Sequence, residues 1–438
     1  MRGMTVGAYN GATTVLAGLA RARRDELLRN SFYILLATAT MAALGFAFWF
    51  VNARMYSAAE IGSATSLISA TSLISYLSLF GFNATIVRFL PSSRDRNRDI
   101  NAGLIVVSTA GLALSAAFVY ALPWIAPELA WLQRSLPLAV AFAVMAAASA
   151  VNLFTDSVFI AIRAAKYNVV IDGVVQGGSR LLLAVLLAGT GAFGMVAASG
   201  IAAVIAACCS LFAMAAVIGY RPRRRLDWRP VRSMVGFSAA TYTASLLNLV
   251  PILVLPLVVL NTLGAGAAGY YFIALQIANL LNAVAYAVCQ SLLAEGSYDD
   301  VDLKRLIRRS ATVLGWAIVP ASIGVAVAGR WLLLLFGEEY SRHGAPTLTV
   351  LALAAVGVAS YCWISILLKL SGQMAALIWM NAAYAAVIVA LATTTAHRGL
   401  VWVAVAWLIG NLVATAIGAT ALVAHRNRQA AGTTVGER

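Results

Sequence analysis

The sequence is poor in charged residues and in the side chains that enzymes use for catalysis. Of its 438 residues, 11% are charged, compared with roughly 25% in an ordinary soluble domain, and there are 3 histidines and 4 cysteines. The cysteines show neither a CxxC motif nor metal-ligand spacing. No general acid–base pair and no phosphate-binding glycine loop is visible. We therefore predict no metal site, no cofactor and no enzymatic activity, and we exclude an ATP-driven pump.

Apolar residues make up most of the remainder. Hydrophobic residues account for 62% of the chain, and the mean hydropathy is +0.87. A helix needs about 20 apolar residues to cross a membrane. The runs of that length are 31–53, 61–90, 102–123, 135–162, 168–190, 193–219, 236–263, 268–293, 310–329, 345–370, 373–395 and 399–424. They leave no room for a soluble domain, so the sequence predicts an all-α integral membrane protein with twelve transmembrane helices.

The basic residues form clusters that predict the orientation in the membrane. Each cluster lies before the first run or after an even-numbered one: 21–29, 94–98, 163–166, 221–232, 304–309 and 426–428. Positive residues mark the cytoplasmic side, which predicts that both termini are cytoplasmic. Topology and attraction to anionic lipid account for the net charge of +15. The lipid bilayer, and not nucleic acid, is therefore the predicted partner.

The chain divides into two halves with the same plan. An offset of 207 residues aligns Gly62 with Gly269, and a similar offset brings Arg163 opposite Lys369. Six spans in each half make the halves parallel, and substrate sites in such proteins lie between the halves near the midplane. The predicted divisions are a cytoplasmic N-terminal segment (1–30), a first six-helix bundle (31–219), a basic cytoplasmic linker (220–235), a second six-helix bundle (236–424) and a cytoplasmic tail (425–438).

Polar side chains form a ladder along the cytoplasmic halves of spans four and five. The residues are Asn152, Asp156 and Arg163 in span four, and Asn168, Asp172, Gln176 and Arg180 in span five. Spacing of four residues keeps the span-five set on one stripe of a helix. Two interpretations stay open. Arg180 pairs with Asp172 or Asp156 as a structural staple, or the stripe lines a water-filled cavity in which Arg180 receives an anion such as phosphate.

The second half carries a comparable stripe without charge, in span eight. Its members are Gln276, Asn279, Asn282, Tyr286 and Gln290. Amides can hydrogen-bond sugar hydroxyls, or they can join neighbouring helices. Arg88, at the cytoplasmic end of span two, is a further cationic candidate for substrate binding. On a straight helix it points away from the polar stripe of that span, which favours an interfacial position.

Two stretches resemble a known family. "NARMYSAAEIGSATSLISATSLISYLSLFGFNATIVRFLP" is similar to the first helix pair of bacterial polysaccharide-biosynthesis membrane proteins, and "TDSVFIAIRAAKYNVV" to the end of their fourth span. These proteins are O-antigen-type flippases for lipid-linked oligosaccharides, in the multidrug/oligosaccharidyl-lipid/polysaccharide (MOP) exporter superfamily. The resemblance implies a V-shaped pair of six-helix lobes around a central cationic cavity. It maps the cationic residues of that cavity to Arg180, with Arg88 and Arg163 as further positions.

The resemblance also implies a function. An undecaprenyl-diphosphate-linked oligosaccharide, a precursor of cell-surface polysaccharide such as lipopolysaccharide O-antigen, would move from the cytoplasmic to the outer leaflet of the bacterial plasma membrane by alternating access. The coupling ion would be H⁺ or Na⁺. A polysaccharide polymerase or glycosyltransferases would be functional partners.

Narrower and rival interpretations are weaker. Lipid II flippases of this superfamily carry arginines in or near their first span, and this chain has none between Arg29 and Arg54. Its drug/cation antiporters use an acid in the first span, and no acid occurs over residues 31–59. A polytopic glycosyltransferase needs acids in a first outer loop, which here offers Glu60 alone. The antiporter and the glycosyltransferase stay as alternatives to the flippase.

Overall fold

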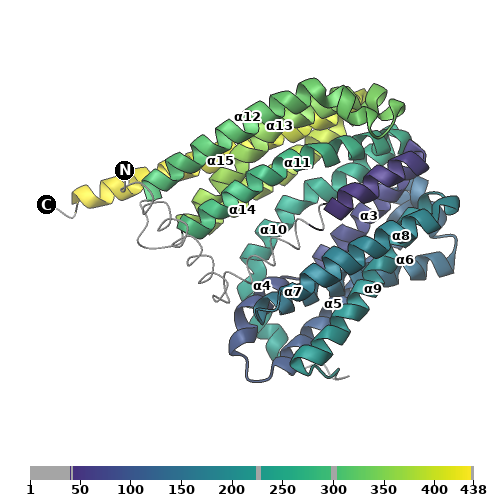
Figure 1. Ribbon diagram of the computed structural model, residues 1–438. Coiled ribbons are helices and arrows are strands. Elements are labelled where there is room, and N and C mark those ends of the chain that lie inside the picture. The colour runs from purple at the N-terminus through teal and green to yellow at the C-terminus, as the bar shows by residue number, and fades with distance from the viewer. Residues whose placement is uncertain (1–39, 41–42, 223–227, 297–302, 436–438) are drawn as a thin grey trace, which may run out of the picture.

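The computed structural model describes residues 40, 43–222, 228–296 and 303–435, and within these ranges it contains helices and no strand. Two lobes form a V (Figure 1). The N-lobe contains a helix over residues 43–55, α3 (Ala58–Ser78), α4 (Phe82–Phe89), η1 (Leu90–Ser92), α5 (Arg96–Ile125), η2 (Pro127–Leu132), α6 (Leu136–Ala161), α7 (Lys166–Asn168), η3 (Val169–Gln176), α8 (Gly177–Leu186), η4 (Ala188–Thr190) and α9 (Ala192–Ile218). The C-lobe contains α10 (Trp228–Leu263), α11 (Ala265–Gly296), α12 (Leu303–Leu334), α13 (Glu338–Leu370), α14 (Met374–Thr395), η5 (Ala396–Arg398) and α15 (Leu400–Val435).

The predicted class, an all-α multi-pass membrane protein, is confirmed. Among the described residues, 10 helices are long and apolar enough to cross a membrane, and the bent pair α3–α4 makes an eleventh span. Each corresponds to one of the predicted runs. The remaining predicted run, 31–53, lies partly outside the described residues, so the count of twelve stays a prediction.

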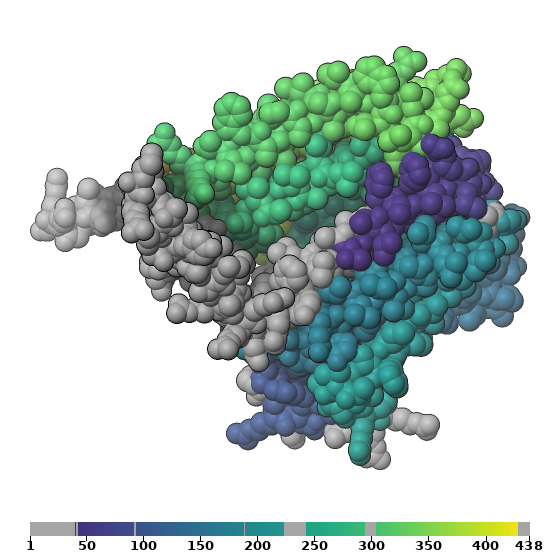
Figure 2. Space-filling view, in the orientation of Figure 1, coloured from purple at the N-terminus to yellow at the C-terminus, as the bar shows by residue number. Residues whose placement is uncertain are grey.

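The lobes meet at one end of the molecule and separate toward the other, the end at which α15 projects (Figures 1 and 2). At the closed end, the Arg54 guanidinium donates two hydrogen bonds, of 2.8 and 2.7 Å, to the carbonyl of Leu335 in the other lobe. Trp49 packs edge-on against Phe272 of the C-lobe, with ring centroids 4.5 Å apart. If the predicted topology holds, the closed end faces outward and the V opens inward.

Two glycines let the lobes cross at close range. A Cβ on Gly62 of α3 would lie 1.7 Å from the carbonyl oxygen of Ala265, and a Cβ on Gly269 of α11 would lie 2.1 Å from the carbonyl oxygen of Ala58. Such contacts are possible only without a side chain. The offset of 207 residues relates both glycines and both alanines, so each half makes the same contact on the other, as in an isologous interface.

The repeat recurs, with a slightly different offset, where α6 and α13 end. In α6 the amide of Ala164 donates to the carbonyl of Phe159 (2.8 Å), and in α13 Gln373 donates to Leu368 (2.9 Å), an offset of 209 residues. In this register Arg163, with φ of 58°, corresponds to Gly372, with φ of 71°. The alignment of Arg163 with Lys369, an offset of 206 residues, is therefore wrong by three residues, because the register at these helix ends has an offset of 209 and differs from that of the Gly62–Gly269 crossing.

The second span is broken, which the sequence did not indicate. Phe80 and Gly81 have positive φ of 44° and 81°, and α3 and α4 meet at a bend of 47°. At the break the last carbonyls of α3 accept long hydrogen bonds from amides three residues later, Tyr76 from Leu79 (3.3 Å) and Leu77 from Phe80 (3.4 Å). The hydroxyl of Tyr242, from α10, also donates to these two carbonyls, at 3.0 and 2.7 Å. Helix α10 thereby fastens the C-lobe to the bend of the N-lobe.

Candidate functional site

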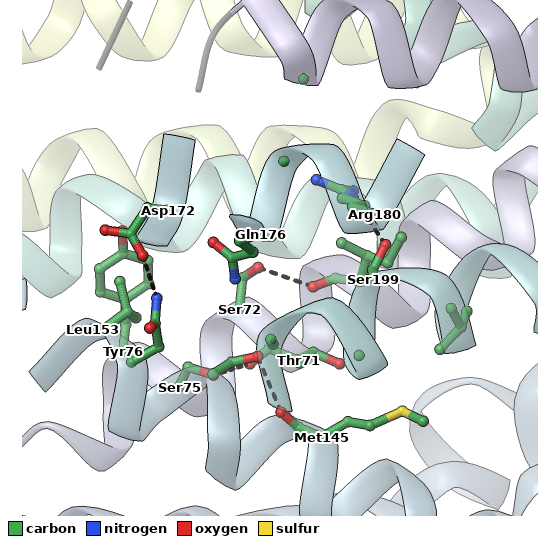
Figure 3. Close-up of a pocket in the computed structure, with 18 of the residues that line it drawn as sticks. Thr71, Ser72, Ser75, Tyr76, Met145, Leu153, Asp172, Gln176, Arg180 and Ser199 are labelled. Atoms are coloured by element: carbon green, nitrogen blue, oxygen red, sulfur yellow. Dashed lines mark hydrogen bonds between the residues drawn. The ribbon is translucent and has the colours of Figure 1, made fainter. Parts of the chain in front are cut away.

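A polar cavity of about 250 Å³ lies inside the N-lobe, walled by helix 43–55, α3, α6, the η3–α8 span and α9. Figure 3 shows Asp172, Gln176 and Arg180 in a row on one side, with the hydroxyl residues Ser72 and Ser75 of α3 facing them. The stripe predicted from the four-residue spacing thus lines a cavity. Asn168, the first member of the ladder, does not line it, because its amide donates instead to the backbone carbonyl of Asp156 (3.2 Å).

The span that carries the stripe is not a uniform α-helix. Its segment η3, which includes Asp172, is a π-helix, a conformation found frequently at functional sites. Glycines on the same span allow helix 43–55 to pack closely against it. A Cβ on Gly177 would lie 2.8 Å from the Leu44 side chain. Two local features therefore position the polar residues: the wide turn of the π-helix, and the glycines beside them that let helix 43–55 approach.

Asp172 is buried and held by a hydrogen-bonded chain. The amide of Asn152 donates to its carboxylate (2.7 Å), and Ser210 in turn donates to the Asn152 carbonyl oxygen (3.3 Å). The carboxyl group of Asp156 lies close to that of Asp172, and both residues line the cavity. Two carboxyl groups this close cannot both be ionised at low cost, so one proton or one cation between them is favoured.

Arg180 occupies the other end of the cavity without an acid partner. Its Nε donates to the Ser199 hydroxyl (3.0 Å), and its guanidinium carbon lies 4.0 Å from the Phe48 ring centroid and 5.5 Å from that of Trp49. Among the described residues no ion pair joins it to an acid. Cation–π contacts support the charge, and no described residue accepts from the two terminal nitrogens. The staple interpretation therefore has no counterpart in the part of the chain that the structure describes.

A second cavity, of about 500 Å³, lies inside the C-lobe between α10, α11, α13 and α14. The hydroxyl of Tyr361 donates to the Asn381 amide oxygen (2.6 Å), and the Asn248 amide donates to the Tyr361 oxygen (2.8 Å). The Asn381 amide completes the network by donating to the carbonyl of Ala244 (2.8 Å). No acid among the described residues lines this cavity, and Lys369 at its edge supplies its charge.

Comparison with known proteins adds the family. The family model for polysaccharide biosynthesis proteins matches residues 27–293. The chain belongs to the polysaccharide biosynthesis protein family. No curated protein sequence matches it.

Solved structures with the same fold are those of MOP-superfamily transporters. A lipid II flippase, MurJ, in an inward closed conformation is 12% identical, with a TM-score of 0.73 over 89% of this chain and 87% of that one. A multidrug resistance MATE transporter in an inward-facing conformation is 15% identical, with a TM-score of 0.66 over 90% and 94%. A Vibrio cholerae MATE transporter is 13% identical, with a TM-score of 0.61 over 91% and 97%. These likenesses establish the fold.

The other predicted site residues lie outside the two cavities. Arg88 is exposed on α4, beyond the bend, with its guanidinium over the Phe89 ring (5.5 Å). Arg163 is exposed in the left-handed turn after α6. The sequence placed both near the cytoplasmic end of the same lobe as Arg180, but the bend and the turn direct them away from the N-lobe cavity lining.

The predicted amides of α11 divide into two groups. Gln276, Asn279 and Asn282 bond mainly to each other, since Asn279 donates to Gln276 and Asn282 to Asn279, both at 3.3 Å. None of the three lines the C-lobe cavity, whereas Tyr286 and Gln290 from the same stripe do. The sequence missed Tyr361 and Asn381 because single polar residues inside apolar runs give no periodic signal.

Proposed function

We propose that the protein moves an undecaprenyl-diphosphate-linked oligosaccharide from the cytoplasmic to the outer leaflet of the bacterial plasma membrane by alternating access. Family membership supports a role in the synthesis of a cell-surface polysaccharide such as O-antigen. The observation that carries the proposal is Arg180, a guanidinium inside the N-lobe that has unused donors and no acid partner within the described part of the chain. Guanidinium donors fit phosphate oxygens in a bidentate manner, so the diphosphate is its natural ligand.

The acid pair of the same cavity supplies a means of coupling. Asp156 and Asp172 lie side by side, and H⁺ or Na⁺ between them would relieve the repulsion of two buried carboxylates. The cation and the diphosphate have opposite charge and share one cavity of about 250 Å³. The charge of a ligand bound at one site therefore changes the affinity of the other site, and such coupling between sites is the requirement for coupled transport.

The orientation and division of the chain follow the charge pattern. We place residues 1–30, 220–235 and 425–438 in the cytoplasm and the two six-helix bundles at 31–219 and 236–424. The V would then open to the cytoplasm, where glycosyltransferases build the lipid-linked saccharide. A polymerase would use the product on the outer side.

A cation-coupled drug antiporter is the second candidate. The acid pair favours it, because carboxylates in a cavity can bind a cationic drug as well as a coupling ion, and MATE transporters share the fold. Arg180 in the same cavity disfavours a cationic substrate by repulsion.

Two measurements separate these functions. Depletion of the protein should cause an undecaprenyl-diphosphate saccharide to accumulate in the cytoplasmic leaflet. Purified protein in proteoliposomes should expose that lipid to a lectin or glycosidase added outside. Efflux of a cationic dye driven by an H⁺ or Na⁺ gradient, with no movement of the lipid, would establish the antiporter instead.

A further inference from the structure

We infer that the C-lobe cavity is a saccharide-binding subsite that holds a neutral sugar unit of the cargo while the N-lobe cavity holds its diphosphate. The inference rests on the proposed function and adds to it the part of the cargo that each lobe recognises. It concerns a cavity whose key residues, Tyr361 and Asn381, lie outside the polar stripe visible in the sequence.

The two cavities are built on the same contact. In the N-lobe, Asn152 of α6 bonds to Asp172, which lies 20 residues later. In the C-lobe, Tyr361 of α13 bonds to Asn381, also 20 residues later. The offset of 209 residues that superposes the ends of α6 and α13 also relates both members of these two pairs. The C-lobe cavity is therefore the counterpart of the N-lobe cavity and not an incidental gap between helices.

The chemistry of the counterpart differs at each equivalent position. An amide, Asn381, replaces the carboxylate of Asp172, and by the same offset a hydroxyl, Ser365, replaces the carboxylate of Asp156. Valine stands at the position that corresponds to Arg180. Among the described residues, the lining thus has no carboxylate and one cation, Lys369 at the edge, and it offers both hydrogen-bond donors and acceptors. A ligand rich in neutral hydroxyl groups, which donate and accept equally, matches such a lining.

Several of these groups are available to a ligand. The Gln290 amide faces the cavity from α11 and makes no hydrogen bond within the described part of the chain. Ser365 lines the cavity beside Tyr361, and its buried hydroxyl has no hydrogen-bond partner among the described residues, so a small shift of the side chain would let it bond to a ligand. The ring of Tyr286, 38% exposed, gives an apolar face for the C–H side of a sugar.

The size and the position of the cavity suit the cargo. Its volume of about 500 Å³ lies within the range of roughly 300–1,000 Å³ of small-molecule sites. Lys369, in the last turn of α13, lies at its edge. A lipid diphosphate bound in the N-lobe could therefore extend its sugar across the space between the lobes.

The test uses the purified full chain in lipid nanodiscs, with thermal unfolding as the readout. One set of probes is a panel of neutral methyl glycosides, including those of glucose, galactose, rhamnose and N-acetylglucosamine. The other probe is inorganic pyrophosphate, which tests the N-lobe cavity alone. The variants are Gln290→Ala, whose side chain is exposed, Ser365→Leu, which fills the cavity, and Arg180→Ala.

At least one glycoside should raise the unfolding temperature of the unaltered protein. Gln290→Ala should weaken its apparent affinity by about tenfold, as expected for the loss of one or two neutral hydrogen bonds. Ser365→Leu should abolish the effect, whereas Arg180→Ala should retain it and lose the response to pyrophosphate. The inference is overturned if no glycoside stabilises the protein or if Gln290→Ala and Ser365→Leu respond as the unaltered protein does. Loss of the pyrophosphate response alone would contradict the diphosphate proposal and leave the saccharide subsite standing.

Discussion

The N-lobe and C-lobe cavities have one architecture and two kinds of chemistry. Each is centred on a hydrogen bond between residues 20 positions apart, Asn152 to Asp172 in one and Tyr361 to Asn381 in the other. The N-lobe cavity contains two acids and Arg180, whereas the C-lobe cavity is neutral apart from Lys369 at its edge. The difference shows that a repeated helical frame conserves how helices meet while leaving the charge of the enclosed side chains free to diverge.

The largest expected effect is the loss of the charge that distinguishes the N-lobe. Arg180→Ala should lower lipid flipping by about 100-fold or more, because charge-assisted hydrogen bonds to the diphosphate are lost. Arg180→Lys should keep part of the activity, since the charge survives but the bidentate geometry does not. Flipping in proteoliposomes and melting of the purified variants measure the two properties separately.

The control for Arg180 is the removal of Asp172, the acid to which a structural staple would join it. If Arg180 were a staple, Arg180→Ala would destabilise the protein, and Arg180→Ala combined with Asp172→Asn would restore both stability and transport. A fully active double variant would contradict the anion-receptor role. Ser199→Ala, which removes one hydrogen bond of the guanidinium, should reduce flipping only slightly.

Converting the N-lobe acid into its C-lobe counterpart sharpens the comparison. Asp172→Asn keeps an oxygen that accepts from Asn152 but removes the ionisable group. We expect flipping to fall about tenfold and to lose its dependence on an H⁺ or Na⁺ gradient, because the single acid Asp156 then has no like charge to neutralise. Flipping measured with and without an imposed gradient checks this, and an unchanged gradient dependence would show that coupling lies elsewhere.

The reciprocal glycines test whether the halves are equal at their crossing. Gly62→Ala and Gly269→Ala each place a Cβ inside contact distance of a carbonyl in the other lobe, and each should destabilise the protein by about 1–3 kcal/mol. Gly266→Ala is the matched control on α11, since a Cβ there meets nothing within 4 Å. Thermal unfolding compares the three. If one of these two variants unfolds at a much lower temperature and the other is unchanged, the two halves do not make equivalent contacts at the crossing.

The bond that ties α10 to the bend of α3 should have a smaller effect. Tyr242→Phe removes the donor to the carbonyls of Tyr76 and Leu77, which should cost about 1 kcal/mol of stability. Melting of the variant against Thr393→Val, whose hydroxyl bonds only within its own helix, isolates the contribution between the lobes. Equal melting temperatures would show that the Tyr242 hydroxyl contributes nothing to stability through these two carbonyls.

The smallest effects are expected on the amide ladder of α11. Gln276→Ala or Asn282→Ala removes bonds that the amides make with each other, so flipping should change about twofold to threefold, in keeping with the small contributions of such bonds in membranes. Rates with several saccharides measure any shift in preference. Complete loss of flipping at normal expression would place the main binding residues in α11 and reverse the division of labour between the lobes.

Local patterns predicted much of the fold and part of the site. Apolar runs and their flanking arginines depend on the immediate sequence, and so does the four-residue spacing of Asp172, Gln176 and Arg180, which line the N-lobe cavity as expected. The broken α3–α4 span was not predicted, because Phe80 carries no signal for a positive φ. Arg88, which a straight helix would have placed differently, lies beyond that bend.

The sequence by itself determined that this chain is an all-helical membrane protein with two related halves, since hydropathy and periodicity act over single helices. It also indicated the alignment of Gly62 with Gly269. The structure explains why glycine stands at both positions, because a Cβ there would overlap a carbonyl oxygen of the other lobe. Only the tertiary structure decided that Arg180 bonds to Ser199 and stacks on Phe48 instead of pairing with an acid. It alone also decided that Tyr361 donates a hydrogen bond to Asn381 in a second cavity. Those contacts join residues on different helices, and the packing of the helices, not the spacing along one of them, sets which side chains meet.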